Sequence, residues 1–252
     1  MKVIQKEIVL NFVLSRKQED GGFSFAQEAP ATFEDTYYAL QILHELEISY
    51  DEEKTTDFIR LIEKSRLLVK HLFQLAHLSK TYKLSLPWLN GIIEKSCFVQ
   101  ATDSESIYYS AKLARIVNNA NLMNKLKEKR IQISNKEHLL TELCWKAIAL
   151  KKLRVDFNED AVAERIKGFQ GHDSGFSFRK KGAPSFMEGT YLAIEALSEL
   201  KQQPRDVQKC IMFVEMCRAN NGGFGRQITT VPTLESTYHA IKSLKLLGMI
   251  KK

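Results

Sequence analysis

Two residues that can move protons or bind a metal stand out because they break a repeated pattern. Three stretches share an acid-x-x-Tyr signature: EDTY at 34–37, EGTY at 188–191 and ESTY at 235–238. His239 follows the last of these tyrosines, where the other copies carry Tyr38, Tyr109 or Leu192, and a degenerate copy carries Lys146. Asp35 sets a second carboxylate beside Glu34, where other copies have Gly, Ser or Leu. Imidazole and carboxylate groups serve as acids, bases and zinc ligands, so both positions are candidate functional sites. For His239, a hydrogen-bonded histidine in the wall of the fold is the alternative.

Each signature follows a glycine loop at a nearly fixed distance. From the loop phenylalanine to the signature glutamate the spacing is 11 residues for Phe23, 12 for Phe176 and 11 for Phe224. Such constancy indicates an internal repeat. Degenerate copies lie at Glu63, Glu105 and Glu142. A residue that every copy needs is expected to be structural: the glutamate interacts with the helix dipole, the tyrosine packs between hairpins, and the glycines permit a positive-φ turn.

The repeat must be built from helices. Between glycine and proline breaks, apolar residues recur at helical spacing, and strand-like alternation is nearly absent. We expect twelve helices, at about 2–16, 32–48, 51–61, 65–79, 86–98, 103–118, 121–134, 136–153, 158–171, 184–200, 204–219 and 233–248. Paired consecutively, they give six antiparallel hairpins of about 42 residues. Such pairs can stack as an open solenoid or close into a ring, and six is the number that closes. The predicted fold is all-α, an α/α toroid (α/α barrel) of six helical hairpins, in a single domain over residues 1–252.

Composition narrows the class of protein. The chain has 252 residues, 44% of them hydrophobic, and no apolar run long enough to span a membrane. The four cysteines have neither zinc-finger nor disulfide-framework spacing, so we expect reduced thiols and a cytoplasmic location. The first residues are amphipathic and mixed in charge, so we expect no secretory signal. The basic residues behind the net charge of +7 are spread over helix surfaces, where they alternate with acidic residues. We therefore expect no nucleic-acid partner, while a bias toward anionic ligands such as phosphates stays open.

A Gly-Gly-Phe loop followed by a Ser/Thr-Tyr-x-Ala helix resembles the prenyltransferase and squalene-cyclase repeat, closest to that of protein prenyltransferase β subunits. The resemblance is strong in the first, fifth and sixth hairpins and weak between them. It implies the α/α toroid, with a central cavity lined by aromatic side chains that holds an isoprenoid chain. It also implies transfer of a prenyl group from a prenyl diphosphate to an acceptor presented by a helical partner subunit.

The resemblance implies a metal site as well. In prenyltransferase β subunits an Asp-x-Cys-Tyr pattern and a later histidine hold zinc. That pattern falls on Glu188, Thr190 and Tyr191 here, and His239 lies 51 residues after Glu188. Glu188 and His239 are thus implied zinc ligands, and Tyr191 is implied to steady the leaving group. Thr190 departs from the pattern, because a threonine hydroxyl is a poor zinc ligand.

The loop SGFSFRKKGAPSF corresponds to the part of the family that binds diphosphate. Arg179 and Lys181 lie at or near the family's Arg and Lys positions, whereas the family's diphosphate histidine falls on Glu142, a second departure. Tyr38 and Tyr109 are candidates to line the isoprenoid cavity, with core packing as the alternative.

Two further functions stay open. Class II terpenoid cyclases resemble the first hairpin through Asp-x-Asp-Asp-Thr-Ala, which falls on residues 32–37 and would make Glu34 or Asp35 the acid that protonates an alkene. Neighbours on a helix point about 100° apart, so these two carboxylates need not share a proton. The other alternative is a non-catalytic scaffold that binds an isoprenoid or a protein, which the missing cysteine and histidine favour.

Overall fold

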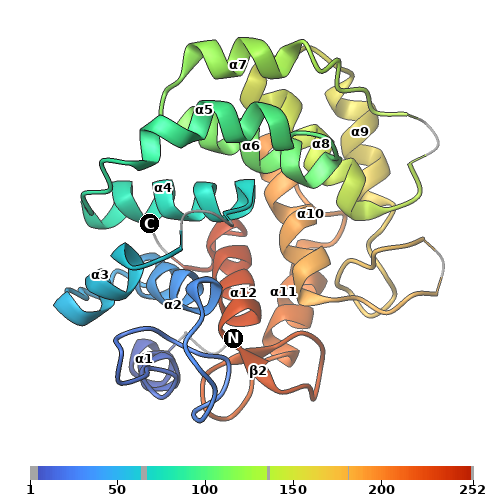
Figure 1. Cartoon of the computed structure of the whole chain (residues 1–252). Coiled ribbons are helices and arrows are strands. Elements are labelled where there is room, and N and C mark those ends of the chain that lie inside the picture. Colours follow the sequence, from blue (N-terminus) through green and yellow to red (C-terminus); the bar gives the residue numbers. More distant parts are fainter. Residues whose placement is uncertain (1–4, 64–66, 135–136, 181, 251–252) are drawn as a thin grey trace. The chain divides into compact units, whose positions relative to one another are not determined.

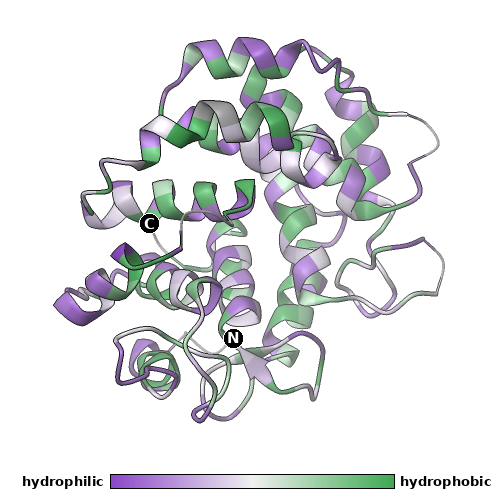
Figure 2. Cartoon of the chain, in the orientation of Figure 1, coloured by the Kyte–Doolittle hydropathy of each residue, from purple (hydrophilic) through white to green (hydrophobic). Residues whose placement is uncertain are grey.

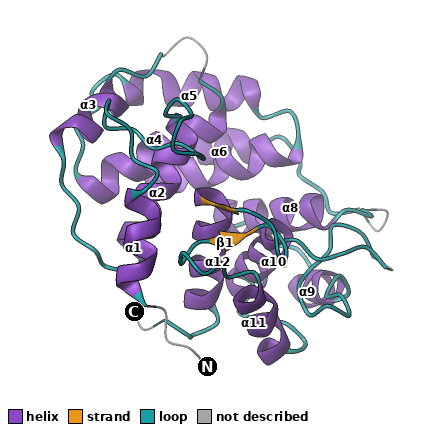
Figure 3. Cartoon of the chain, turned by 90° about the horizontal axis from the view of Figure 1, so that it is seen from below, coloured by secondary structure: helices purple, strands orange, loops and turns teal. Residues whose placement is uncertain are grey.

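A computed structural model describes residues 5–63, 67–134, 137–180 and 182–250. Within these ranges the chain forms twelve helices and one ribbon of two short strands (Figures 1 and 3). The elements are α1 (Lys6–Leu14), α2 (Phe33–Glu45), α3 (Glu53–Arg60), α4 (Val69–Tyr82), α5 (Leu89–Gln100), α6 (Ser104–Ile116), α7 (Ala120–Lys127), α8 (Leu140–Leu153), α9 (Glu159–Lys167), α10 (Met187–Glu199), α11 (Val207–Met216), β1 (Phe224–Gly225), β2 (Pro232–Thr233) and α12 (Leu234–Leu246). The predicted all-α class and the twelve helices are confirmed, although α4, α5 and α8 begin a few residues later than expected and α7 ends earlier.

The chain divides into two compact units. The first comprises residues 1–62, 169–195 and 203–252, and the second comprises 63–168 and 196–202. The first unit therefore contains α1 to α3, most of α10, α11 and α12, while the second contains α4 to α9. The prediction of a single domain and the closure of six hairpins into one ring stay predictions.

Within each unit the helices pack side by side through their apolar faces, whose alternation with polar faces is visible in Figure 2. In the first unit α12 lies along α2, so the last hairpin of the chain contacts the first. In the second unit α6 packs against both α4 and α8. The cores contain fully buried aliphatic side chains such as Ile42 and Leu43 in α2 and Leu143 and Ile148 in α8.

The helices of the repeat begin at side-chain caps. Thr32 precedes α2 and accepts a hydrogen bond from the Asp35 amide, and Thr233 does the same for Ser236 at the start of α12. Asp103 caps α6 through the amide of Ser106. Each cap satisfies an amide that has no partner within its helix, which fixes where the helix starts.

The glycine loops of the first, fifth and sixth hairpins share the same structure. The phenylalanine of each loop is fully buried, and its backbone N–H donates to a threonine hydroxyl in the first turns of the next helix. The three pairs are Phe23 with Thr36, Phe176 with Thr190 and Phe224 with Thr237, each at 2.9 Å. We refer to this hydrogen bond as the loop clamp. In the loop of the sixth hairpin, β1 (Phe224–Gly225) pairs with β2 (Pro232–Thr233). These strands are too short to show strand alternation in the sequence.

The two glycines of a loop have different tasks. The first takes a positive φ, +88° at Gly21 and +89° at Gly222, as the sequence predicted. The second lies against a phenylalanine of a neighbouring helix: a Cβ at Gly22 would come within 2.8 Å of Phe58 in α3, and one at Gly223 within 2.7 Å of Phe12 in α1. The sixth loop thus contacts α1 as the first loop contacts α3.

Candidate functional site

Three of the predicted site residues meet in one aromatic cluster in the first unit. Tyr38 from α2, Tyr191 from α10 and His239 from α12 converge, with Tyr238 completing the group. The His239 ring stacks on Tyr191 with a centroid distance of 4.5 Å and an interplanar angle of 12°, and Tyr38 meets His239 edge-on at 5.8 Å. We call these four side chains the aromatic cluster. The sequence had assigned Tyr238 to packing alone, because the shared tyrosine recurs in several hairpins.

The four residues of the aromatic cluster are buried but not completely. Their exposed fractions are 6% for Tyr38, 8% for Tyr191, 6% for Tyr238 and 7% for His239, whereas Ala39 and Ile42 beside them have none. Burial raises the pKa of the Tyr238 phenol far above its ordinary value, and the nearby Glu195 and Glu45 carboxylates add to the effect, while hydrogen bonds with Tyr191 and Tyr37 oppose it. The Tyr238 phenol therefore keeps its proton more tightly than an ordinary tyrosine.

Carboxylates lie at the N-terminal ends of the same helices. The Tyr38 hydroxyl donates to Glu235 Oε1 over 2.8 Å, which joins α2 to α12. Asp35 accepts a hydrogen bond from the Thr32 hydroxyl at 2.7 Å. Burial raises the pKa of Asp35; the Thr32 hydrogen bond and the Phe25 amide oppose this, while the charges of Glu34 and Glu235 reinforce it. The Asp35 carboxylate thus binds the hydroxyl of the capping residue Thr32, and its proton is held more tightly than that of an ordinary aspartate.

Glu188, an implied zinc ligand, and Thr190, which stands at the position of the family's cysteine ligand, both have other partners. Glu188 pairs with Arg226 of the next loop at 3.4 Å, and both side chains are about half exposed. The Thr190 hydroxyl is fully buried and accepts the loop-clamp hydrogen bond from Phe176. Among the residues that the structure describes, no three His, Cys, Asp or Glu side chains are grouped so that they could hold a metal ion. The donor set at these positions does not fit a zinc centre.

The loop implied to bind diphosphate is described except at Lys181, which lies outside the described residues. Arg179 is exposed, and the Lys180 ammonium lies 5.1 Å from the Phe169 ring centroid. Phe178 and Phe186 stack across the loop at 5.2 Å, and the Arg226 guanidinium lies 4.7 Å from the Phe186 ring. The roles of Arg179 and Lys181 stay predictions. Arg226 was not foreseen, because its contacts join two different hairpins.

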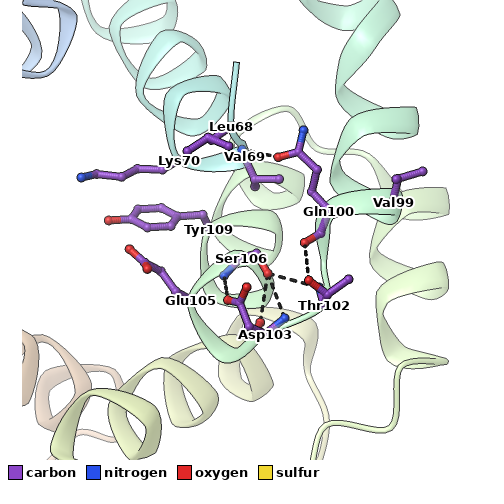
Figure 4. A pocket seen from close by; sticks show the side chains of 10 residues that line it. All are labelled: Leu68, Val69, Lys70, Val99, Gln100, Thr102, Asp103, Glu105, Ser106 and Tyr109. Atoms are coloured by element: carbon purple, nitrogen blue, oxygen red, sulfur yellow. Dashed lines mark hydrogen bonds between the residues drawn. The ribbon is translucent and has the colours of Figure 1, made fainter. Parts of the chain in front are cut away.

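Tyr109 lies in the second unit, at a pocket of about 420 Å³ formed by α4, α5 and α6 (Figure 4). The pocket is lined by Leu68, Val69, Lys70, Val99, Gln100, Thr102, Asp103, Glu105, Ser106 and Tyr109. In Figure 4 the Tyr109 ring lies between the side chains of Lys70 and Glu105. We call this the α6 pocket.

The bounds of α4 correct one interpretation of the sequence. Glu63 precedes α4 and does not belong to its first turn, so it is not the sixth copy of the shared acid. Lys70 is the second residue of α4, as Glu34 is of α2 and Glu105 is of α6. The second hairpin therefore replaces the shared acid by lysine and the shared tyrosine by Phe73.

Comparison with protein families agrees with this architecture. A family model of the prenyltransferase alpha-alpha toroid domain matches residues 1–182 and 125–252, which together span the chain. The chain belongs to the prenyltransferase alpha-alpha toroid family, and the resemblance seen in its sequence is confirmed. The two matches overlap, as repeats do when they align in more than one register. A search of curated proteins gave no match. Among the described helices, none has both the length and the apolar character that a membrane crossing requires.

Proposed function

We propose that this protein binds an isoprenoid chain against the aromatic cluster and does so without a zinc centre. Membership of the prenyltransferase alpha-alpha toroid family supports an isoprenoid as the ligand. The geometry of the cluster supports the place, because four packed aromatic side chains offer the polarisable surface that an alkene chain packs against.

The proposal that binding occurs without a zinc centre rests on the loop clamp at Thr190. This position corresponds to the cysteine that holds zinc in the prenyltransferases the sequence resembles, and here its hydroxyl accepts the Phe176 amide. Thr36 makes the same hydrogen bond in the first hairpin, which has no implied metal ligand, and Thr237 makes it in the sixth. Thr190 is therefore part of the hairpin architecture. Without a thiolate ligand the site lacks the usual means of binding the zinc that would activate an acceptor thiol, so binding of the isoprenoid is favoured over zinc-dependent transfer.

Calorimetry with geranylgeranyl diphosphate tests both halves. We expect the metal-stripped protein to bind, and one equivalent of zinc to leave the dissociation constant unchanged. Tyr191→Ala and His239→Ala should weaken binding, whereas Tyr109→Ala, in the second unit, should not. Tighter binding with zinc would restore the transferase interpretation, in which a helical partner subunit presents the acceptor. Absence of binding in both conditions would refute the isoprenoid proposal.

A cyclase-like activity is the second candidate, and the raised pKa of Asp35 favours it. A carboxyl group that keeps its proton can act as a general acid toward an alkene. The hydrogen bonds from Thr32 and the Phe25 amide stabilise the ionised form and count against this role. Product analysis with Glu34→Gln and Asp35→Asn decides, since unchanged conversion of an isoprenoid in both variants would eliminate a carboxylate acid.

A further inference from the structure

We draw no further inference here: the strongest candidate, the Gln41 side-chain amide in the core of the first unit, one turn after Tyr38 in α2, has no hydrogen-bond partner among the described residues, but it carries nothing because this side chain is fully buried and has no exposed surface through which a ligand could reach it.

Discussion

The hydroxyl oxygen of Thr190 lies 2.9 Å from the backbone nitrogen of Phe176 and accepts its hydrogen bond. The same threonine–phenylalanine pair closes the loops of the first and sixth hairpins at the same distance. Because each phenylalanine side chain is fully buried, its amide has no access to water and depends on the threonine. This relationship explains why a threonine stands where the resembling prenyltransferases have a zinc ligand: in this chain the position belongs to the repeat.

Thr190→Val should lower the free energy of unfolding by about 1–3 kcal/mol, because it leaves the buried Phe176 amide without an acceptor while preserving the volume of the side chain. Urea denaturation measures the change. Thr190→Ser keeps the hydroxyl and should recover most of the loss.

The matched controls are Thr36→Val and Thr237→Val, which remove the same hydrogen bond from the other two loops. They should cost a similar amount. A neutral Thr190→Val beside two destabilising controls would mean that Thr190 is not structural, and its position would again be open to a ligand role.

Gly223 cannot take a side chain. A Cβ there would lie 2.7 Å from the ring of Phe12 and 2.8 Å from Pro232 Cβ. Gly223→Ala should therefore destabilise the protein by about 1–3 kcal/mol through overpacking. Gly91→Ala is the control, since no atom lies within 4 Å of its Cβ position in α5. It should stabilise by about 0.5–1 kcal/mol through helix propensity. Equal effects at both positions in thermal unfolding would contradict the close contact of the sixth loop with α1.

Ser174 occupies the position of the first loop glycine in the fifth hairpin and has a φ of +80°. A residue with a Cβ is strained there, whereas Gly21 and Gly222 are not. Ser174→Gly should raise the free energy of unfolding by up to about 1 kcal/mol, the released strain exceeding the added entropy of the unfolded chain. Ser174→Ala keeps the Cβ and should bring no gain. If alanine stabilises as much as glycine, the strain does not come from the backbone.

The helices and the glycine loops could be predicted because their signals are local. Apolar spacing, capping threonines and a positive-φ glycine act within a few residues, so the positions of α2, α10 and α12 followed from the sequence. The second hairpin was misread at Glu63 because both signature residues had changed there. Spacing is the signal that finds Lys70, which lies 36 residues after Glu34 and 35 before Glu105.

The site was less predictable, because its contacts join distant hairpins. The stacking of Tyr191 on His239 depends on how α10 packs against α12, and the pairing of Glu188 with Arg226 depends on where the sixth loop lies. A single sequence does not state these distances. The loop clamp also explains why Thr190 differs from the expected cysteine, a reason that only the hydrogen bond reveals. The catalytic, diphosphate and metal roles of the named residues stay predictions.

Glu45 makes the stability of the first unit depend on pH. Its side chain is 5% exposed and pairs with Lys242 and with Lys245, the latter at 2.9 Å. Burial alone would raise the pKa of Glu45, but hydrogen bonds and charge attraction from the two lysines outweigh it and hold the pKa below the ordinary 4.5. In the interval between these values the unfolded chain binds more protons than the folded one, so stability rises with pH there. The contribution of Glu45 to stability is thus complete above its unfolded pKa and is lost as pH falls through its folded pKa.

Glu45→Gln should destabilise the protein at neutral pH. The difference in the free energy of unfolding between this variant and the wild type, measured in urea, should shrink as the pH is lowered through this interval. A difference that stays constant with pH would show that Glu45 contributes by packing and not by its charge.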